Sequence, residues 1–278
     1  MKLISESNWI SKIEELEKQK LKHSKEDLKN AIIESIKKQA KKNNAVLFSG
    51  GIDSTLIALI LKKLNKEFTC YTVGIENSKD VQAAEEIATC LGFKLKSRIF
   101  SMDGVEDSLK ETYKILKQKD PIKLSIGAVI NSAIDLAKSD NQKNLFSGLG
   151  AEELFIGYER YRKSKDPIKD CWQGLRTTWK RDISRDITIA KKKKVILNSP
   201  LLQEEAILQA MAFPVEMKFN NEKDKIILRE IAIDLGLPKE FAYRKKVAAQ
   251  YGSGFDKIIT KLAKRDGHKL KRDYINKL

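Results

Sequence analysis

The stretch that decides the fold is SGGIDS at residues 49–54. It follows a short apolar segment, 45–48, which is typical of a buried strand, and it leads directly into an apolar segment with helical periodicity, 55–64. A strand, a glycine-containing turn and a helix in this order place the turn at the carboxyl end of a strand. In open α/β sheets that end of the strand binds ligands.

The residues of this turn are suited to holding phosphate. Gly50 and Gly51 allow backbone N–H groups to approach an anion without obstruction, and the helix start adds unpaired donors and a positive dipole. Ser49 and Ser54 add hydroxyl donors. Asp53 is the exception, because a carboxylate repels phosphate unless a divalent cation lies between them. The turn therefore predicts a phosphate site that includes a divalent cation.

Working outward, apolar strand patterns alternate with amphipathic helices. Strands are predicted at 68–73, 94–100 and 144–146, and helices at 78–91, 105–117 and 124–138. This alternation predicts parallel βαβ units in a doubly wound, Rossmann-like sheet with helices on both faces. We expect three parts: an N-terminal helical extension, 1–43; a nucleotide-binding core, 44–150; and a helical part that completes the site, 151–278.

Composition narrows the class of protein. The chain of 278 residues is 41% hydrophobic and 33% charged, and it has neither a membrane-spanning apolar run nor an apolar N-terminal signal, so we expect a cytoplasmic protein without a membrane partner. The net charge of +16 allows a nucleic-acid partner. Lysines are spread through every segment and often alternate with acids, so this partner is not favoured.

Cysteine and histidine offer little catalytic material. None of the three cysteines forms a CxxC pair, and we expect Cys70 and Cys90 to be buried thiols. The two histidines lie in lysine-rich surroundings, so we predict no catalysis by imidazole.

A second motif follows the predicted strand 144–146. It reads SGLGAEELFIGYERY at residues 147–161 and brings Gly148 and Glu152 to the carboxyl end of another strand. Asp53 and Glu152, from two strand ends, can hold one cation that bridges phosphate oxygens.

Both motifs resemble those of a known family. SGGIDS is similar to the signature of the PP-loop ATP pyrophosphatases, and the second motif resembles the synthetase domain of asparagine synthetases. The resemblance implies an adenine nucleotide α-hydrolase type of fold, a loop that grips the β,γ-pyrophosphate, and cleavage of ATP between the α- and β-phosphates. It also implies that Gly148 contacts the nucleotide, that Val73 and Gly74 support the adenine, and that Asp53 and Glu152 share Mg²⁺.

The C-terminal part extends the resemblance. KIILR at 225–229 and RKKVAAQYGSG at 244–254 are similar to the family's closing motifs. In the family the later lysine stabilises charge at the adenylating centre and the earlier lysine meets the pyrophosphate. We therefore predict catalytic roles for Lys246 and Lys225, which suit a compact ammonium charge.

The resemblance fails on the acceptor side. Leu149 stands where the family has a residue of the acceptor chemistry, and Ile196 and Asn198 replace an acid and an arginine, which puts aspartate in doubt as the substrate. Full-length asparagine synthetases carry a glutaminase domain whose catalytic cysteine follows Met1, whereas Lys2 follows it here. We expect no glutaminase activity of the chain itself, although a separate glutaminase subunit remains a candidate partner.

These residues predict an ATP-dependent amide ligase of amino-acid biosynthesis, with ATP and Mg²⁺, that adenylates a small-molecule carboxylate and transfers it to ammonia or another amine. Two alternatives stay open: a non-catalytic ATP-binding scaffold, and a PP-loop tRNA-modifying enzyme. Arg181 and Arg185, one helical turn apart, either hold a carboxylate of the acceptor or form an ion-pair ladder along their helix.

Overall fold

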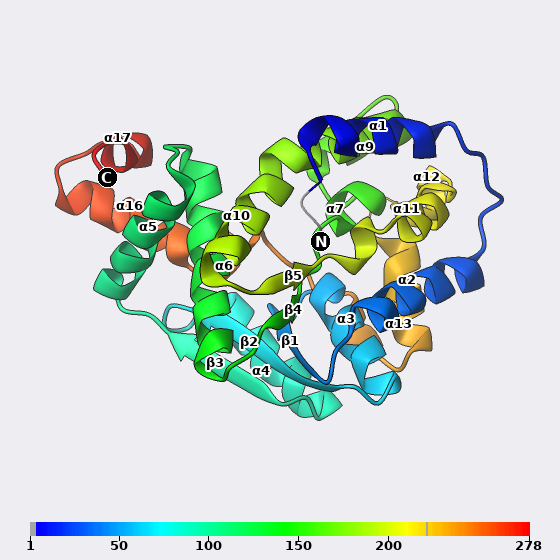
Figure 1. Ribbon diagram of the computed structural model, residues 1–278, viewed down its shortest axis with the longest axis horizontal. Coiled ribbons are helices and arrows are strands. Elements are labelled where there is room, and N and C mark those ends of the chain that lie inside the picture. The colour runs from blue at the N-terminus through cyan, green and yellow to red at the C-terminus, as the bar shows by residue number, and fades with distance from the viewer. Residues whose placement is uncertain (1–3, 221) are drawn as a thin grey trace.

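A single parallel sheet organises the structure (Figure 1). The computed structural model describes residues 4–220 and 222–278, so the first three residues of the predicted extension 1–43 lie outside the described residues. The strands are β1 Asn43–Leu47, β2 Glu67–Gly74, β3 Leu95–Ile99, β4 Asn144–Phe146 and β5 Ile196–Asn198. They are all parallel and lie in the order β3-β2-β1-β4-β5.

Both faces of the sheet are covered by helices, as apolar strands without strict alternation require. The helices of the first half are α1 Glu6–Glu17, α2 Lys25–Gln39, α3 Ile52–Lys63, α4 Lys79–Leu91, α5 Met102–Leu116 and α6 Pro121–Ser139. In β1, Ala45 joins the core beneath α6, while its neighbour Val46 joins the core that includes α3. The predicted doubly wound α/β fold is confirmed.

The chain reverses direction across the sheet between β1 and β4. It runs from β1 outward to β2 and β3 and then returns to place β4 on the other side of β1. A crevice forms at such a switch point beyond the carboxyl ends of the strands. The loop 49–54 and the motif 147–161 both begin at this point.

The second half is helical except for β5, which the sequence did not predict. Its helices are α7 Ala151–Leu154, α8 Glu159–Arg162, α9 Pro167–Thr178, the π-helix η1 Trp179–Ile183, α10 Ser184–Lys193, the 3₁₀-helix η2 Pro200–Leu202, α11 Glu204–Met211, α12 Val215–Lys218, α13 Ile226–Asp234, α14 Lys239–Ala242, α15 Ala249–Gly252, α16 Phe255–Arg265 and α17 Lys271–Asn276. Because β5 pairs with β4, the segment beyond residue 150 completes the sheet. The division into three parts remains a prediction.

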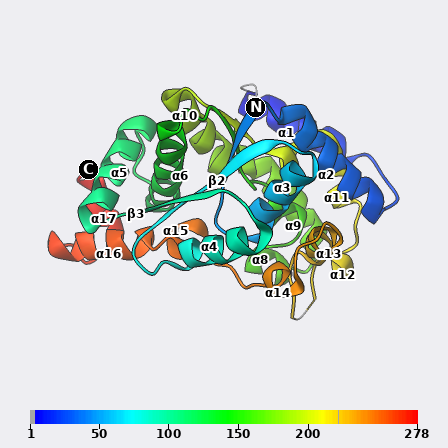
Figure 2. The same ribbon diagram turned by 90° about the horizontal axis from the view of Figure 1, so that it is seen from below.

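The N-terminal helices lie at one end of the molecule and α16 and α17 at the other (Figure 2). α2 begins with a side-chain cap, since the Ser24 hydroxyl accepts the Asp27 N–H at 3.2 Å. In α1 the buried face is Trp9, Ile13 and Leu16, and the Trp9 indole donates to the Leu175 carbonyl at 2.8 Å. The apolar faces of α1 and α2 are therefore used within the chain.

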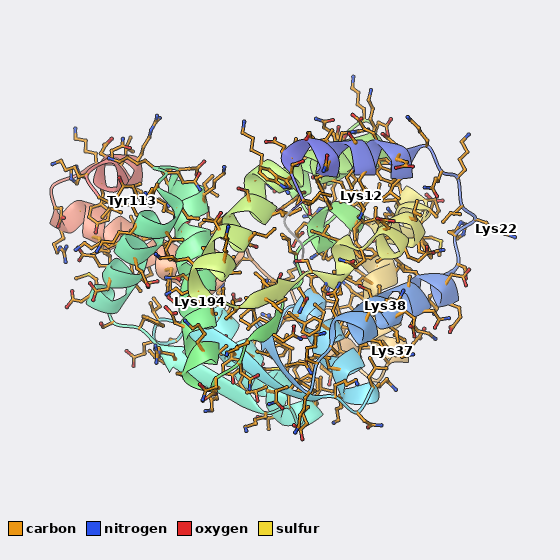
Figure 3. The ribbon with its side chains drawn as sticks, in the orientation of Figure 1. Lys12, Lys22, Lys37, Lys38, Tyr113 and Lys194 are labelled. Carbon is orange, nitrogen blue, oxygen red and sulfur yellow. The ribbon has the colours of Figure 1, made fainter. Side chains whose placement is uncertain are left out.

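The positive charge is distributed over the surface. The labelled side chains of Lys22, Lys37 and Lys38 are exposed and come from the α1–α2 connection and from α2 (Figure 3). No helix of residues 4–220 and 222–278 has the length and apolar character needed to cross a membrane. Cys70 is buried as expected, whereas Cys90 is exposed near the end of α4, so that expectation was wrong.

Candidate nucleotide and acceptor site

A cavity of about 620 Å³ opens beyond the carboxyl ends of β1, β2, β4 and β5. Leu47, Val73 and Leu197 line it from three strands, and the second motif and the C-terminal segment close its other sides. The sheet therefore supplies the floor of the site, and the helical half supplies its walls.

The phosphate loop joins β1 to α3 with little space to spare. Gly50 has φ +61°, and a Cβ atom there would lie 2.7 Å from the Ala83 carbonyl carbon, so glycine is required. The Ser54 hydroxyl donates to the Gly51 carbonyl at 3.2 Å and accepts the Ser49 N–H at 3.4 Å. Gly51 caps α3 without a side-chain partner, which leaves the N–H groups of the first turn available to an anion.

Asp53 and Glu152 lie close together, and both accept hydrogen bonds from the ammonium group of Lys225. Lys225 Nζ donates to Asp53 Oδ1 at 2.9 Å and Oδ2 at 2.8 Å, and to Glu152 Oε1 at 2.9 Å. Burial alone would lower the pKa of Lys225, but the two carboxylates raise it above its ordinary value. The lysine thus stays charged and neutralises part of the acidic pair.

Two glycines of the second motif make this convergence sterically feasible. A Cβ atom on Gly148 would lie 2.6 Å from Asp53 Cβ, and one on Gly157 would lie 1.8 Å from Glu152 Oε2. Both positions need the absence of a side chain, so the glycines of this motif fit the close approach of the two carboxylates.

The carboxylate pair fits Mg²⁺. Both side chains reach one cationic atom, Lys225 Nζ, so they can reach one metal ion. Mg²⁺ is commonly bound by one or two carboxylates together with phosphate oxygens and water. Within the described residues no group of three or more His, Cys, Asp or Glu side chains could hold a metal, so the remaining ligands of a metal here would come from phosphate and water.

Lys246 and Arg244 lie over the phosphate loop. A Cβ atom on Gly51 would lie 3.3 Å from Lys246 Nζ, and Arg244 Nη2 donates to the Gly50 carbonyl at 2.8 Å. Both cations line the cavity, and neither forms an ion pair with another described residue. Free positive charge is therefore placed where phosphate groups would lie.

Of the two residues predicted to support the adenine, Val73 faces the cavity and Gly74 packs within the sheet. Val73 lines the cavity. Gly74 lies at the end of β2, where its carbonyl accepts the Phe100 N–H at 2.8 Å and its α-carbon packs against the Ser78 hydroxyl. That packing uses the Ser78 side chain, which makes no cap hydrogen bond to α4. Contact of Val73 and Gly74 with adenine remains a prediction.

Arg181 and Arg185 form ion pairs with acids on both sides. Arg181 pairs with Glu153 and, at 2.6 Å, with Asp182. Arg185 pairs with Asp182 at 3.0 Å and Asp186 at 2.7 Å, and only 3% of its side chain is exposed. Arg185 lines the cavity together with Asp182 and Asp186. The ion-pair alternative describes the arrangement, although it extends beyond one helix through Glu153.

The three residues that replace acceptor residues of the family, Leu149, Ile196 and Asn198, lie in different surroundings. Leu149 lines the cavity, whereas Ile196 is half exposed at the sheet edge. Asn198 belongs to the sheet, because its amide donates to Asn144 Oδ1 at 2.9 Å and to the Leu145 carbonyl at 3.1 Å. The residue at the family's arginine position is therefore structural here.

Sequence reasoning missed several charged residues of the cavity. Burial raises the pKa of Glu153 to about 7, against the effect of Arg181, and it raises the pKa of Asp80 to about 6, against Lys246 and Arg244. Glu153 follows Glu152 and could have been recognised as a second inward acid. Asp182 lies in the π-helix η1 and Asp186 lies just after it, in α10. The sequence does not indicate the wider turn of a π-helix, so it could not predict that these two acids line the cavity.

Comparison with known proteins identifies the family of the chain. The family model described as asparagine synthase matches residues 27–182 and 169–276. The chain is 32% identical to "Putative asparagine synthetase (glutamine-hydrolyzing) 1" of Methanocaldococcus jannaschii, covering 88% of this chain and 52% of that protein. It is 31% identical to the human asparagine synthetase (glutamine-hydrolyzing), covering 74% of this chain and 39% of that protein.

The chain thus spans about half the length, or less, of these curated relatives. Among solved structures, an NMN synthetase from Francisella tularensis is similar at a TM-score of 0.45 and 15% identity, covering 98% of this chain and 93% of that one. The family model accounts for most of the chain, including the phosphate loop, the second motif and both C-terminal lysines. The chain therefore belongs to the asparagine synthase family.

Proposed function

We propose that this chain is an ATP-dependent ligase that forms a carbon–nitrogen bond with release of AMP and pyrophosphate. The observation that carries the proposal is the meeting of Asp53, Glu152 and Lys225 beside the phosphate loop, with Lys246 on its other side. Membership of the asparagine synthase family supports the same class of reaction.

In the proposed reaction a substrate carboxylate attacks the α-phosphorus of ATP. A bond forms between the carboxylate oxygen and this phosphorus, the bond to the β-phosphate bridging oxygen breaks, and pyrophosphate leaves. An amine then attacks the acyl carbon, AMP leaves, and the nitrogen loses a proton. Mg²⁺ held by Asp53 and Glu152 would supply charge for the phosphate oxygens.

The lysines have separate tasks in this scheme. Lys246, beside Gly51, stabilises negative charge that develops around the α-phosphate. Lys225, which has two carboxylate partners, keeps its charge and can turn toward the leaving pyrophosphate when a metal ion takes over those carboxylates. The remaining candidate roles of Ser49, Gly50, Ser54 and Gly148 are contacts to the nucleotide.

The proposal is tested by exchange of labelled pyrophosphate into ATP, with a panel of carboxylates, amino acids and tRNA. Asp53→Asn and Glu152→Gln should each lower Mg²⁺-dependent exchange by roughly 10²-fold or more, since each removes a charge from the metal pair. Asp103→Asn, which removes an exposed acid from α5, is the matched control. Circular dichroism checks that the variants fold.

Near-normal exchange in either variant would overturn the metal assignment. Absence of exchange with every carboxylate, together with tight ATP binding, would instead favour the ATP-binding scaffold. Exchange that requires tRNA would favour the modifying enzyme.

A further inference from the structure

The unpaired cations that line the cavity lie at the phosphate loop. Among the described residues, Lys246 and Arg244 are the lining cations without a carboxylate ion-pair partner, and both lie at this loop. Apart from them and from the Asp53–Glu152–Lys225 cluster, the cavity is lined by a surface that we call the acceptor wall, made of Glu153, Tyr158, Asp182, Arg185 and Asp186.

The two arginines Arg181 and Arg185, at or near the acceptor wall, each already form two ion pairs with acids. Arg185 lies between Asp182 and Asp186, with 3%, 10% and 6% of the respective side chains exposed. Arg181, behind the wall, pairs with Glu153 and Asp182. Three acids thus share two guanidinium groups, so neither guanidinium is free to receive a further carboxylate.

This pairing decides which substrate can bind. A second carboxylate on the substrate would find both arginines already paired with acids, and the desolvation cost of such a group is several kcal/mol when it lacks a partner. An ammonium group would instead meet the carboxylate oxygens of Asp182 and Asp186, which line the cavity. Apolar side chains from α6, including Val129 and Ile130, line the cavity and can pack on a hydrocarbon segment.

Resting on the ligase function proposed above, we infer that the acceptor wall selects an amino acid whose single carboxylate is the one adenylated, and that it rejects dicarboxylates such as aspartate. The ammonium of the substrate faces Glu153 and Asp182. Asp186 sets this preference together with Asp182, because the two acids pair with the arginine that would otherwise receive a second carboxylate.

The experiment compares matched ligands on the full chain. Propionate, β-alanine and aspartate share a three-carbon unit that ends in a carboxylate. β-Alanine adds an ammonium group to propionate, and aspartate adds a second carboxylate to β-alanine. Binding of each is measured by saturation-transfer NMR, and pyrophosphate exchange is measured with each at equal concentration; 4-aminobutyrate, glutamate, alanine and leucine extend the series. We expect amino monocarboxylates to exceed both propionate and aspartate by roughly tenfold or more in binding and in exchange.

A variant reverses the preference. Asp186→Asn keeps the volume and an acceptor oxygen for Arg185 but leaves this arginine with Asp182 as its one carboxylate partner among the described residues, so aspartate binding and aspartate-dependent exchange should rise by roughly tenfold. Asp170→Asn removes an exposed acid from α9, the helix that leads into the same π-helix, and serves as the control. Thermal unfolding identifies a variant that has lost its fold, in which case the wild-type series decides.

The outcomes separate this inference from the function on which it rests. Aspartate bound and exchanged best by the wild-type chain would overturn the inference while supporting the ligase. Selective binding of amino monocarboxylates without exchange of any of them would support the specificity and contradict the ligase. Equal binding of propionate and β-alanine would refute a role for the ammonium group.

Discussion

The ammonium group of Lys246 lies beside the phosphate loop, on an exposed segment without regular structure. Lys246→Ala should lower kcat by roughly 10²–10³-fold and raise the KM for ATP by less than tenfold, because its charge is needed mainly as the transition state forms. The measurement is steady-state pyrophosphate release over a range of ATP concentrations. Lys245→Ala, which removes an adjacent exposed lysine that does not line the cavity, is the control.

A Lys246→Ala enzyme with weakened ATP binding and unchanged kcat would make this lysine a ground-state contact. The same result in Lys245→Ala would show that the effect arises from the general positive charge of the segment. Either outcome would remove the catalytic role of Lys246.

At the scale of residues, the sequence predicted the phosphate loop and the acidic pair because their motifs are local and closely spaced. The distance of 172 positions between Asp53 and Lys225 is bridged only by the fold, so their ion pair could not be predicted. The sequence likewise offered no reason to pair Arg181 with Glu153, since helix periodicity describes neighbours within one helix and not those on another.

A short helix, α12, carries a fully buried lysine. Lys218 Nζ lies 3.6 Å from the Met211 sulfur, and burial lowers its pKa to about 8 from the ordinary 10.5. Between those pH values the unfolded chain retains a proton that the folded protein has released. The free energy of unfolding should therefore rise with pH through this window.

Lys218→Met should remove this dependence and stabilise the protein at pH 7, by up to an amount on the order of 3 kcal/mol. Urea unfolding at pH 7 and pH 9.5 measures both effects. Lys192→Met, at an exposed position of α10, should change neither. A destabilised Lys218→Met at pH 7 would mean that the lysine contributes packing or a hydrogen bond that methionine cannot replace.

At the scale of elements, the strands and helices up to β4 were predicted within a few residues, because apolar runs and caps mark them clearly. β5 is as short as β4, which was predicted, but Ile196 at its start is half exposed, so β5 lacks the fully buried pattern of β4 and was missed. Its place in the sheet is set by long-range contacts, including the hydrogen bond that the Asn198 side-chain amide donates to Asn144 Oδ1. The π-helix η1 was missed for a related reason, because one extra residue per turn leaves no composition signal.

At the scale of the whole molecule, the nucleophiles of the chain decide whether it can use glutamine or needs free ammonia as its source of nitrogen. Any amidation by this chain alone should proceed with ammonia and be indifferent to glutamine, because release of the glutamine amide needs an activated nucleophile. Burial raises the pKa of Cys70 and Cys171, which suppresses the reactive thiolate. Product formation with ammonium chloride is compared with that from glutamine at the same concentration, using the substrate found in the exchange assay.

Glutamine-dependent product with stoichiometric glutamate release from this chain would contradict that expectation. Stimulation by glutamine only after a glutaminase is added would support a separate partner subunit. The apolar faces of α1 and α2 are occupied within the chain, so a partner that docks on these helices would meet their charged faces.

The position of Lys225 between Asp53 and Glu152 has a consequence for the order in which ligands arrive. A free divalent ion must displace an ammonium that already pairs with both carboxylates, and it brings no anion of its own to take their place. The nucleotide–metal complex meets a smaller barrier, because its phosphate oxygens offer the lysine a new counter-charge. Lys225 therefore competes with free Mg²⁺ for the two carboxylates. Titration with Mg²⁺ alone should give weak binding, and titration with the preformed complex of Mg²⁺ and ATP should give tight binding.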